Sequence, residues 1–333
     1  MFLLLFLAVA LCKTWRVVSE LASNSPRLWS GGLMACSNTD MLYTVGGTAQ
    51  QVFALSDIAI VAPVNQSLVN RLSLNDLFGS ATTLQWTPVP KSGGPPAMVS
   101  GNVVPLHNHT QYLVFNGIVR TMVLQMKAWL FDCASESWTQ VASPLAPAVS
   151  ALAASINDGR TIMTVGGGNI LGPLDGVWAF DSGLEMWAPV ESTSVPTARI
   201  GACTLPVLNG TVALMIGGFD GSSTVPYSWQ FDFTHLEWNP YLPAALPVNA
   251  SFCQSFAVPG REDSFVIGAY NSADGSFAVH LFENYTYGSR LLSSSYGDAP
   301  GTTPPDLTDL FARAFPQLKK TRKKKKERKT KKE

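Results

Sequence analysis

The chain has 333 residues, of which 46% are hydrophobic and only 14% are charged. This composition excludes disorder over most of the length and allows one large domain or two small ones. The net charge of zero hides a division: residues 319–333 carry eleven basic and two acidic side chains, and the rest carries 12 and 21. The acidic body gives no basis for specific nucleic-acid binding.

Residues 1–12, MFLLLFLAVALC, are apolar up to Lys13 and too short to span a bilayer. Their length and the tripeptide Ala8-Val9-Ala10 fit a secretory signal peptide, although no charged segment precedes them. We therefore predict a signal peptide and a secreted protein. The alternative is a buried first strand. No other stretch is long and apolar enough for a membrane helix, so we predict no transmembrane segment.

Glycine-rich strand ends recur along the chain and predict stacked copies of one unit. They are YTVGG ending at Gly47, LVFNG at Gly117, MTVGG at Gly167, LMIGG at Gly218 and FVIGA at Ala269, at intervals of 70, 50, 51 and 51 residues. After each of the middle three, the pattern Trp-x-Phe-Asp-x5-Trp begins, at Trp129, Trp178 and Trp229.

Each unit reads as four short strands separated by turn residues. The second strand ends in Gly-Gly, the third carries W-x-F-D, and the fourth starts with Trp. We expect the x5 segment to be a hairpin loop with Asp as a turn residue, and the two tryptophans to cover apolar area. A lone unit cannot bury both faces of its sheet, but units stacked around an axis can.

This pattern resembles the kelch repeat, whose units are the blades of a galactose-oxidase/kelch-type β-propeller. The resemblance implies an all-β propeller over residues 13–296, with five blades or, as the alternative, six. The first unit departs from the pattern through an insertion near residues 61–85 and the lack of a first tryptophan. The marks that carry the resemblance are Gly46-Gly47, Gly166-Gly167, Gly217-Gly218, Trp129/Trp138, Trp178/Trp187 and Trp229/Trp238.

The fifth unit lacks its closing tryptophan, whereas Trp15 begins an orphan strand, WRVV, near the N-terminus. We predict that this strand completes the fifth blade and closes the ring, which removes exposed sheet edges. The alternative is that residues 289–296, SRLLSSSY, form the last strand while Trp15 flanks the ring.

The cysteines beyond the predicted signal peptide show no CxxC or metal-ligand spacing. We expect them to be small buried apolar residues, with a Cys203–Cys253 bridge as the alternative. Five sequons fall in loops predicted to be exposed and favour a secreted glycoprotein: Asn65, Asn108, Asn209, Asn249 and Asn284.

Residues 297–318 read as a linker and a short amphipathic helix, because apolar residues from Leu307 to Leu318 fall on one helical face. Residues 319–333 form a polybasic tail that we expect to be disordered. Together they suit an anionic surface such as a membrane, a sulfated glycan or nucleic acid. The alternative is a solvated tail without a partner.

Little in the sequence indicates catalysis or a cofactor. The chain has no GxSxG motif or phosphate loop, and the run VGGGN belongs to the repeat. His107 and His109 alternate on a predicted loop, where we expect solvation rather than metal binding. The copper and iron sites of other kelch-type proteins have no counterpart, so we predict no cofactor and no metal.

Candidate ligand-binding residues lie in loops at one mouth of the predicted channel, as expected for rigid scaffolds. We predict a non-catalytic module that binds an extracellular protein or glycan there. The alternatives are a sugar-acid mutarotase, which would hold a carboxylate with an arginine, and an intracellular kelch scaffold, although no BTB or F-box segment precedes the repeats. The candidates are Arg27 and Arg199 between blades, and Asn169, Asp220 and Asn271 after the glycine pairs.

Overall fold

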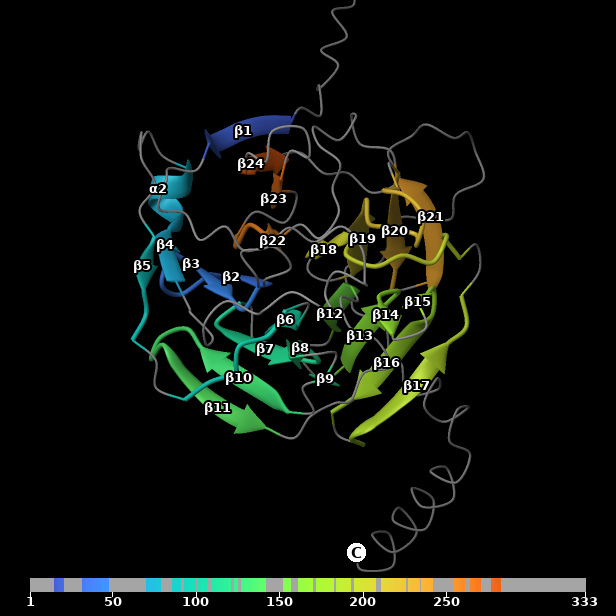
Figure 1. Ribbon diagram of the computed structural model, residues 1–333, viewed down its shortest axis with the longest axis horizontal. Helices are drawn as coiled ribbons and strands as arrows, with labels where there is room; N and C mark the ends of the chain where they lie inside the picture. Colours follow the sequence, from blue (N-terminus) through green and yellow to red (C-terminus); the bar gives the residue numbers. More distant parts are fainter. Residues whose placement is uncertain are drawn as a thin grey trace, which may run out of the picture.

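Four-stranded antiparallel sheets radiate around a common centre in the computed structural model (Figure 1). This arrangement confirms the prediction of an all-β, propeller-like fold. The structure describes residues 15–20, 32–47, 70–78, 86–90, 93–99, 101–106, 109–120, 123–124, 127–141, 152–156, 161–169, 172–182, 184–192, 195–207, 211–225, 227–233, 235–241, 254–260, 264–270 and 277–282.

Four of the sheets are each built from strands of one stretch of chain, which follow one another in chain order outward from the centre. The first sheet holds β2 (Gly32–Cys36), β3 (Met41–Val45), β4 (Asn70–Ser73) and β5 (Thr87–Pro88). The second holds β6 (Asn102–Leu106), β7 (Gln111–Phe115), β10 (Ala128–Asp132) and β11 (Ser137–Val141). The third holds β12 (Leu152–Ile156), β13 (Thr161–Val165), β16 (Val177–Asp181) and β17 (Met186–Val190). The fourth holds β18 (Cys203–Val207), β19 (Val212–Ile216), β20 (Ser228–Asp232) and β21 (Glu237–Tyr241).

The remaining four-stranded sheet, here the closing sheet, joins distant parts of the chain. It holds β22 (Gln254–Ala257), β23 (Phe265–Tyr270), β24 (Phe277–Phe282) and, as its outer strand, β1 (Trp15–Glu20). Trp15 pairs with Phe282, and the antiparallel ladder continues to Glu20 opposite Ala278. The predicted pairing of the Trp15 strand with the last unit is therefore confirmed. The alternative strand at residues 289–296 lies outside the described residues.

The innermost strands surround the centre of the ring (Figure 1). They are β2, β6, β12, β18 and β22, and each lies against the next, with β22 returning to β2. A closed cycle of this kind leaves no sheet of the set with an uncovered face, which explains why strands such as β13 and β19 are buried throughout.

Side chains of an inner strand alternate between its two neighbouring sheets. In β2, Leu33 and Ala35 pack in a cluster shared with the closing sheet, whereas Met34 and Cys36 pack in a cluster shared with the second sheet. The continuous apolar run of this strand follows from burial on both faces. Similar clusters join the second sheet to the third and the third to the fourth.

The turn between the third and fourth strands repeats with the same chemistry, as predicted. Asp132, Asp181 and Asp232 end their strands, and one carboxylate oxygen of each accepts the backbone N–H three residues later, at 2.9, 3.0 and 3.1 Å. The residue four positions after each aspartate has a φ of 50°, 53° and 56°, respectively. The aspartate thus shapes a turn that contains one left-handed residue.

The glycine pairs stand where the chain leaves the second strand, and their conformation explains their residue type. At Gly46-Gly47, Gly166-Gly167 and Gly217-Gly218, φ ranges from 61° to 97°, a region that other residues seldom adopt. Two short hairpins begin at second-strand ends. β8 (Ile118–Arg120) and β9 (Val123–Leu124) follow Asn116-Gly117, where Asn116 has a φ of 56°, and β14 (Gly168–Asn169) and β15 (Gly172–Pro173) follow Gly166-Gly167.

The first sheet departs from its neighbours, but part of the predicted insertion is regular. Residues 61–85 contain β4 and the short helix α2 (Leu74–Phe78). The prediction that this segment is only an insertion is wrong, because β4 is the third strand of the sheet. The strand carries no tryptophan and therefore did not match the repeat pattern. Leu74 and Leu77 of α2 are buried in the cluster shared with the closing sheet.

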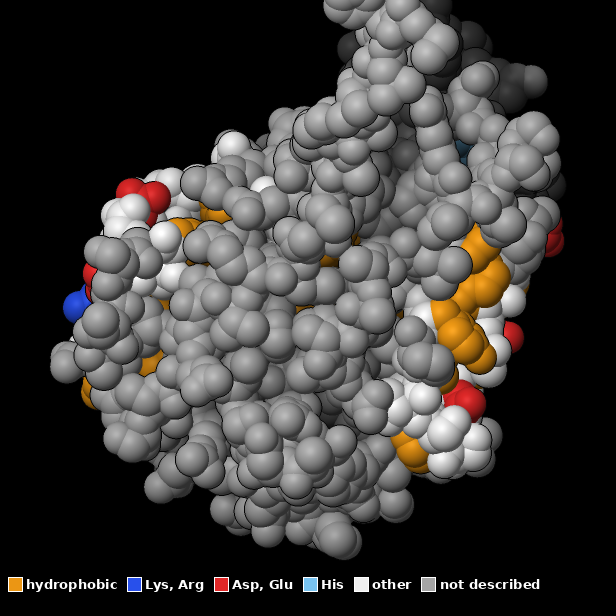
Figure 2. Space-filling model, turned by 90° about the horizontal axis from the view of Figure 1, so that it is seen from above, with side chains coloured by type: hydrophobic (Ala, Val, Ile, Leu, Met, Phe, Trp, Pro, Cys, Tyr) orange, Lys and Arg blue, Asp and Glu red, His pale blue; other side chains and the backbone are white. Residues whose placement is uncertain are grey.

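The surface seen from above shows acidic side chains in several places and few basic ones among the described residues (Figure 2). A strip of hydrophobic side chains lies on the right of this view, with acidic groups beside it. The distribution agrees with the acidic body deduced from the sequence.

Candidate functional site

The segment that leads from the third sheet to the fourth is bonded to both sheets. The carbonyl of Arg199 accepts the N–H of Gly167 in the third sheet at 3.1 Å, and Ile200 exchanges two 2.9 Å hydrogen bonds with Phe219 in the fourth. The same arrangement recurs two seams earlier, between the first and second sheets, where the carbonyl of Met98 accepts the N–H of Gly47 and Val99 pairs with Ile118. These backbone bonds fix the seams at the mouth that carries the glycine pairs.

The side chain of Arg199 is buried in this seam, with 1% of the residue exposed. Its Nε donates to the carbonyl of Thr197 at 3.0 Å, and its Nη1 donates to the carbonyls of Gly217 and Tyr227 at 3.0 and 3.2 Å. Its Nη2 is buried and has no acceptor within the part of the chain that the structure describes. Burial lowers the pKa of the guanidinium, while Tyr227 and Asp220 act in the opposite direction. Arg199 therefore holds the loop that follows the glycine pair at both of its ends.

Asp220 lies in that loop and is held in one orientation by its neighbours. Its Oδ1 accepts the backbone N–H and the hydroxyl of Ser222 and the backbone N–H of Ser223, each at 2.8 Å. These hydrogen bonds, chiefly those from the two backbone N–H groups, lower the pKa of Asp220 to about 2. The carboxylate is consequently charged at neutral pH and fixed at the surface.

Tyr227 ends the same loop and presents its side chain to solvent, with 49% of the residue exposed. The guanidinium carbon of Arg199 lies 5.9 Å from the centre of the tyrosine ring, a cation–π distance. We call Arg199, Asp220 and Tyr227 the lip residues. They combine a buried cation, an ionised acceptor and an exposed aromatic ring on one loop and its neighbouring segment.

Comparison with the second sheet shows that the fold does not require these residue types. Arg199 stands four residues before β18, where Met98 stands four before β6. Tyr227 directly precedes β20, where Lys127 directly precedes β10. Asp220 follows Gly218 by two residues, where Val119 follows Gly117 by two. The combination of an arginine, an aspartate and a tyrosine is thus absent from the matched positions of the second sheet.

The other predicted site residues are less informative. Asn169 lies in β14, paired with Gly172, at the position that matches Asp220. Arg27 and Asn271 lie outside the described residues, as do all five sequon asparagines. Their roles stay predictions. Sequence reasoning missed Tyr227, although its place directly before a W-x-F-D strand was a usable signal.

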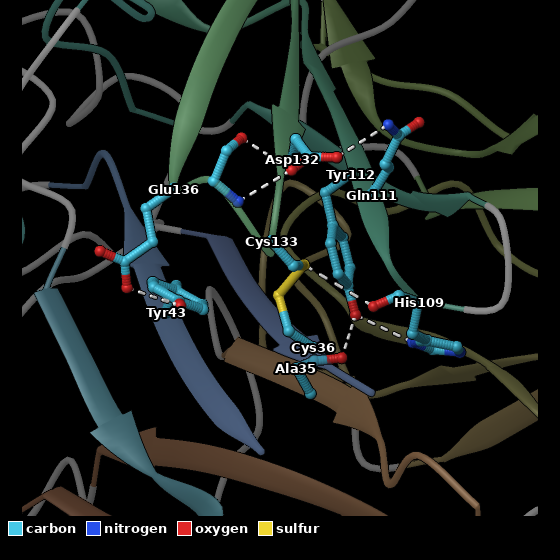
Figure 3. Close-up of a disulfide and its surroundings, with 10 residues drawn as sticks. Ala35, Cys36, Tyr43, His109, Gln111, Tyr112, Asp132, Cys133 and Glu136 are labelled. Carbon is cyan, nitrogen blue, oxygen red and sulfur yellow. Dashed lines mark hydrogen bonds between the residues drawn. A yellow bond between two sulfur atoms is a disulfide. The ribbon is translucent and has the colours of Figure 1, made fainter. Parts of the chain in front are cut away.

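On the opposite edge of the ring, a disulfide joins the first sheet to the second (Figure 3). Cys36 ends β2 and Cys133 follows β10; their Cα atoms are 6.0 Å apart, and both residues have no exposed surface. Cys203 is also disulfide-bonded, to a partner outside the described residues. The expectation of free buried cysteines is wrong for these three residues. For Cys36 and Cys133 the reason is that the packing of the first sheet on the second brings together strand ends 97 residues apart.

Polar contacts surround this disulfide and connect the same two sheets (Figure 3). The Tyr112 hydroxyl donates to the carbonyl of Ala35 at 2.6 Å and lies 2.8 Å from Nδ1 of His109. Since the hydroxyl proton is used by Ala35, Nδ1 of His109 carries the proton and donates to Tyr112. The carbonyl of His109 accepts the N–H of Ser37 at 3.1 Å. His109 therefore has a structural role in the described contacts.

A second set of contacts crosses this seam nearby. Glu136, in the turn after Cys133, accepts the hydroxyl of Tyr43 at 2.9 Å and forms an ion pair with Arg71. Burial, followed by the hydrogen bond to Glu136, raises the pKa of Tyr43 to about 12. We call the disulfide and these polar contacts the inter-sheet clamp.

The clamp predicts a loss of stability in mild acid. Burial lowers the pKa of His109 from 6.5 to about 4. The unfolded chain therefore binds a proton first, and the contribution of His109 is complete above pH 6.5 and falls by about 3 kcal/mol on the way to pH 4. His109→Asn, which tolerates the local φ of 64°, should flatten this part of the pH profile in urea unfolding. Equal profiles for His109→Asn and the unmodified protein would contradict the assignment.

Comparisons with known proteins do not assign the chain to a family. No protein-family model matches the chain, and no curated protein matches it. Within the part of the chain that the structure describes, no helix has the length and apolar character to cross a membrane. The same part contains no group of three His, Cys, Asp or Glu residues placed to hold a metal ion.

Proposed function

We propose that this chain is a secreted, glycosylated kelch-type propeller that binds an extracellular protein or glycan through its lip residues, without catalysis. The observation that carries the proposal is the departure of Arg199, Asp220 and Tyr227 from the residue types at the matched positions of the second sheet. Loops on a rigid scaffold are where such folds hold binding residues. Residue types that the second sheet does without, gathered on one loop and its neighbouring segment, fit that role.

The kelch assignment and the number of blades belong to the proposal. Glycine pairs with positive φ and repeated aspartate turns support the assignment. The closed cycle of the inner strands β2, β6, β12, β18 and β22 supports a five-bladed ring. In this proposal, residues 1–12 are a signal peptide and residues 13–296 form the propeller.

The secreted location is supported by the cysteines. Cys36 and Cys133 are separated by 97 residues and joined in a disulfide without exposed surface, and Cys203 is also bonded. Disulfides of this structural type persist mainly in oxidising compartments. This observation favours the extracellular module over an intracellular scaffold.

The mutarotase alternative receives no such support. It needs an arginine that reaches the carboxylate of a substrate, and Arg199 is buried beneath the lip with two of its nitrogens already bonded to backbone carbonyls. An anionic partner for the tail at residues 319–333 stays a prediction.

The location is tested by expressing the full chain in a eukaryotic secretory cell with a tag placed before the basic tail. We expect a band in the medium whose mobility increases after treatment with an N-glycosidase, because the sequons pass through the secretory pathway. Asn-to-Gln replacement of all five sequons should give the mobility of the treated band. A band that is confined to the cytosol and keeps its mobility after N-glycosidase treatment would overturn the secreted location.

A further inference from the structure

We propose that the lip binds a neutral sugar residue of a glycan, with one face of the sugar on the Tyr227 ring and its hydroxyl groups on the Asp220 carboxylate. This inference rests on the binding function proposed above and names the class of ligand. It is argued from three properties of the lip: an exposed ring, a fixed acceptor and the balance of charge.

The exposed ring is the first property. Among the residues whose side chains the structure describes, Tyr227 is the only aromatic residue in the exposed class, and Val195, 45% exposed, begins the neighbouring segment. An aromatic ring fixed at one end offers a flat apolar surface at low entropic cost. The C–H face of a pyranose is flat and apolar in the same way, whereas a protein partner would be expected to need a larger apolar patch.

The fixed acceptor is the second property. All three donors from Ser222 and Ser223 bind Oδ1 of Asp220, which leaves Oδ2 for a ligand. Hydroxyl groups of a sugar can donate to a charged carboxylate in hydrogen bonds stronger than neutral ones. The loop that carries Asp220 also abuts the third sheet, since a Cβ added at Gly221 would lie 3.7 Å from Pro173.

The balance of charge is the third property and separates neutral sugars from sugar acids. The positive charge of Arg199 is buried, whereas the negative charge of Asp220 is at the surface. A ligand carboxylate would therefore meet the exposed carboxylate before the buried guanidinium, and like charges disfavour such an approach. A neutral polyhydroxyl ligand avoids this repulsion.

Arg199 acts here as a positioning residue. Its Nη1 bonds the carbonyls of Gly217 and Tyr227, which are the two ends of the loop bearing Asp220. Its Nη2, which is buried and has no acceptor among the described residues, carries two N–H donors that the seam does not use, and buried donors are usually satisfied by water or ligand. The oxygen of a ligand hydroxyl or of a water molecule would accept the hydrogen bonds that Nη2 donates.

The test is saturation-transfer NMR on the secreted full chain after enzymatic trimming of its own glycans. The probes are methyl glycosides of glucose, galactose, mannose, N-acetylglucosamine, fucose and xylose, with galacturonate and N-acetylneuraminate as sugar acids. We expect transfer to at least one neutral glycoside. Tyr227→Ala and Asp220→Asn should each weaken it more than tenfold, and Lys127→Ala, at the position that matches Tyr227, should leave it unchanged.

Arg199 has its own comparison. Arg199→Met places at this seam the residue type of Met98, so the ring should fold while binding weakens. Arg199→Lys, which keeps a donor for the two carbonyls, should restore binding more than it restores thermal stability. Equal loss of binding in both variants would refute the positioning role.

Three results of the glycoside experiment would overturn the sugar inference. They are the absence of transfer to every neutral glycoside, tighter binding of the sugar acids, and binding that survives both Tyr227→Ala and Asp220→Asn. A purified, glycan-free protein ligand whose binding is lost in those variants would also overturn it but would retain the proposed binding module. A sugar bound elsewhere on the ring would remove the lip from both proposals.

Discussion

Replacing Cys36 and Cys133 together by alanine is expected to lower the free energy of unfolding by about 4 kcal/mol. The bond closes a loop of 97 residues between the first and second sheets, and chain-entropy arguments give a large effect for loops of this length. Both residues are fully buried, so alanine leaves a small apolar gap instead of an exposed polar group. Urea unfolding of the secreted protein, followed by tryptophan fluorescence, measures the change.

The control for this prediction is the ion pair of the same clamp. Arg71→Gln breaks the contact with Glu136, but Arg71 is 40% exposed, so the loss should be under about 1 kcal/mol. A double alanine variant as stable as the unmodified protein would show that the polar contacts and apolar packing alone hold the two sheets together.

Trp238→Ala is expected to cost about 4 kcal/mol, the second large effect. Trp238 is 2% exposed, and its ring centre lies 5.1 Å from that of Phe231 and 6.5 Å from that of Trp229. Truncation would leave a large cavity in the cluster shared by the third and fourth sheets. The indole N–H has no acceptor among the residues that the structure describes, and its removal offsets a small part of the loss.

The matched position in the second sheet provides the control for this variant. Trp138 packs on Phe131 with ring centres 4.8 Å apart, but it is only partly buried. Trp138→Ala should therefore cost clearly less than Trp238→Ala in the same thermal or urea unfolding experiment. Equal costs would mean that the second tryptophan of each unit contributes through its turn rather than through its burial.

The sheets could be predicted because their marks repeat with fixed spacing. The glycine pairs require positive φ, and the aspartates of W-x-F-D shape one type of turn, so local backbone chemistry is visible in the residue types. The strand at Trp15 could be assigned to the closing sheet because one unit lacked its last strand. In each case, a regular pattern made the missing or repeated element evident.

The remaining features depend on contacts between sheets, which no local pattern encodes. Cys36 and Cys133 fall at unrelated points of their units, and only the packing of the first sheet on the second brings them together. The exposure of Tyr227 and the burial of Arg199 likewise depend on which side of the seam each side chain faces. Strand β4, the third strand of the first sheet, was not predicted because it contains no tryptophan.

The pairing of Trp15 with Phe282 means that the ring can close only at the end of biosynthesis. Strand β1 leaves the ribosome among the first structured residues, yet its partner β24 follows only after the rest of the ring has been made. At ordinary translation speeds, β1 waits roughly 10–50 s for β24. During that interval its pairing edge and that of the growing ring are open to other chains. The last step of folding is therefore expected to be rate-limiting, and chaperones that shield extended segments should affect the yield of this protein more than its final stability.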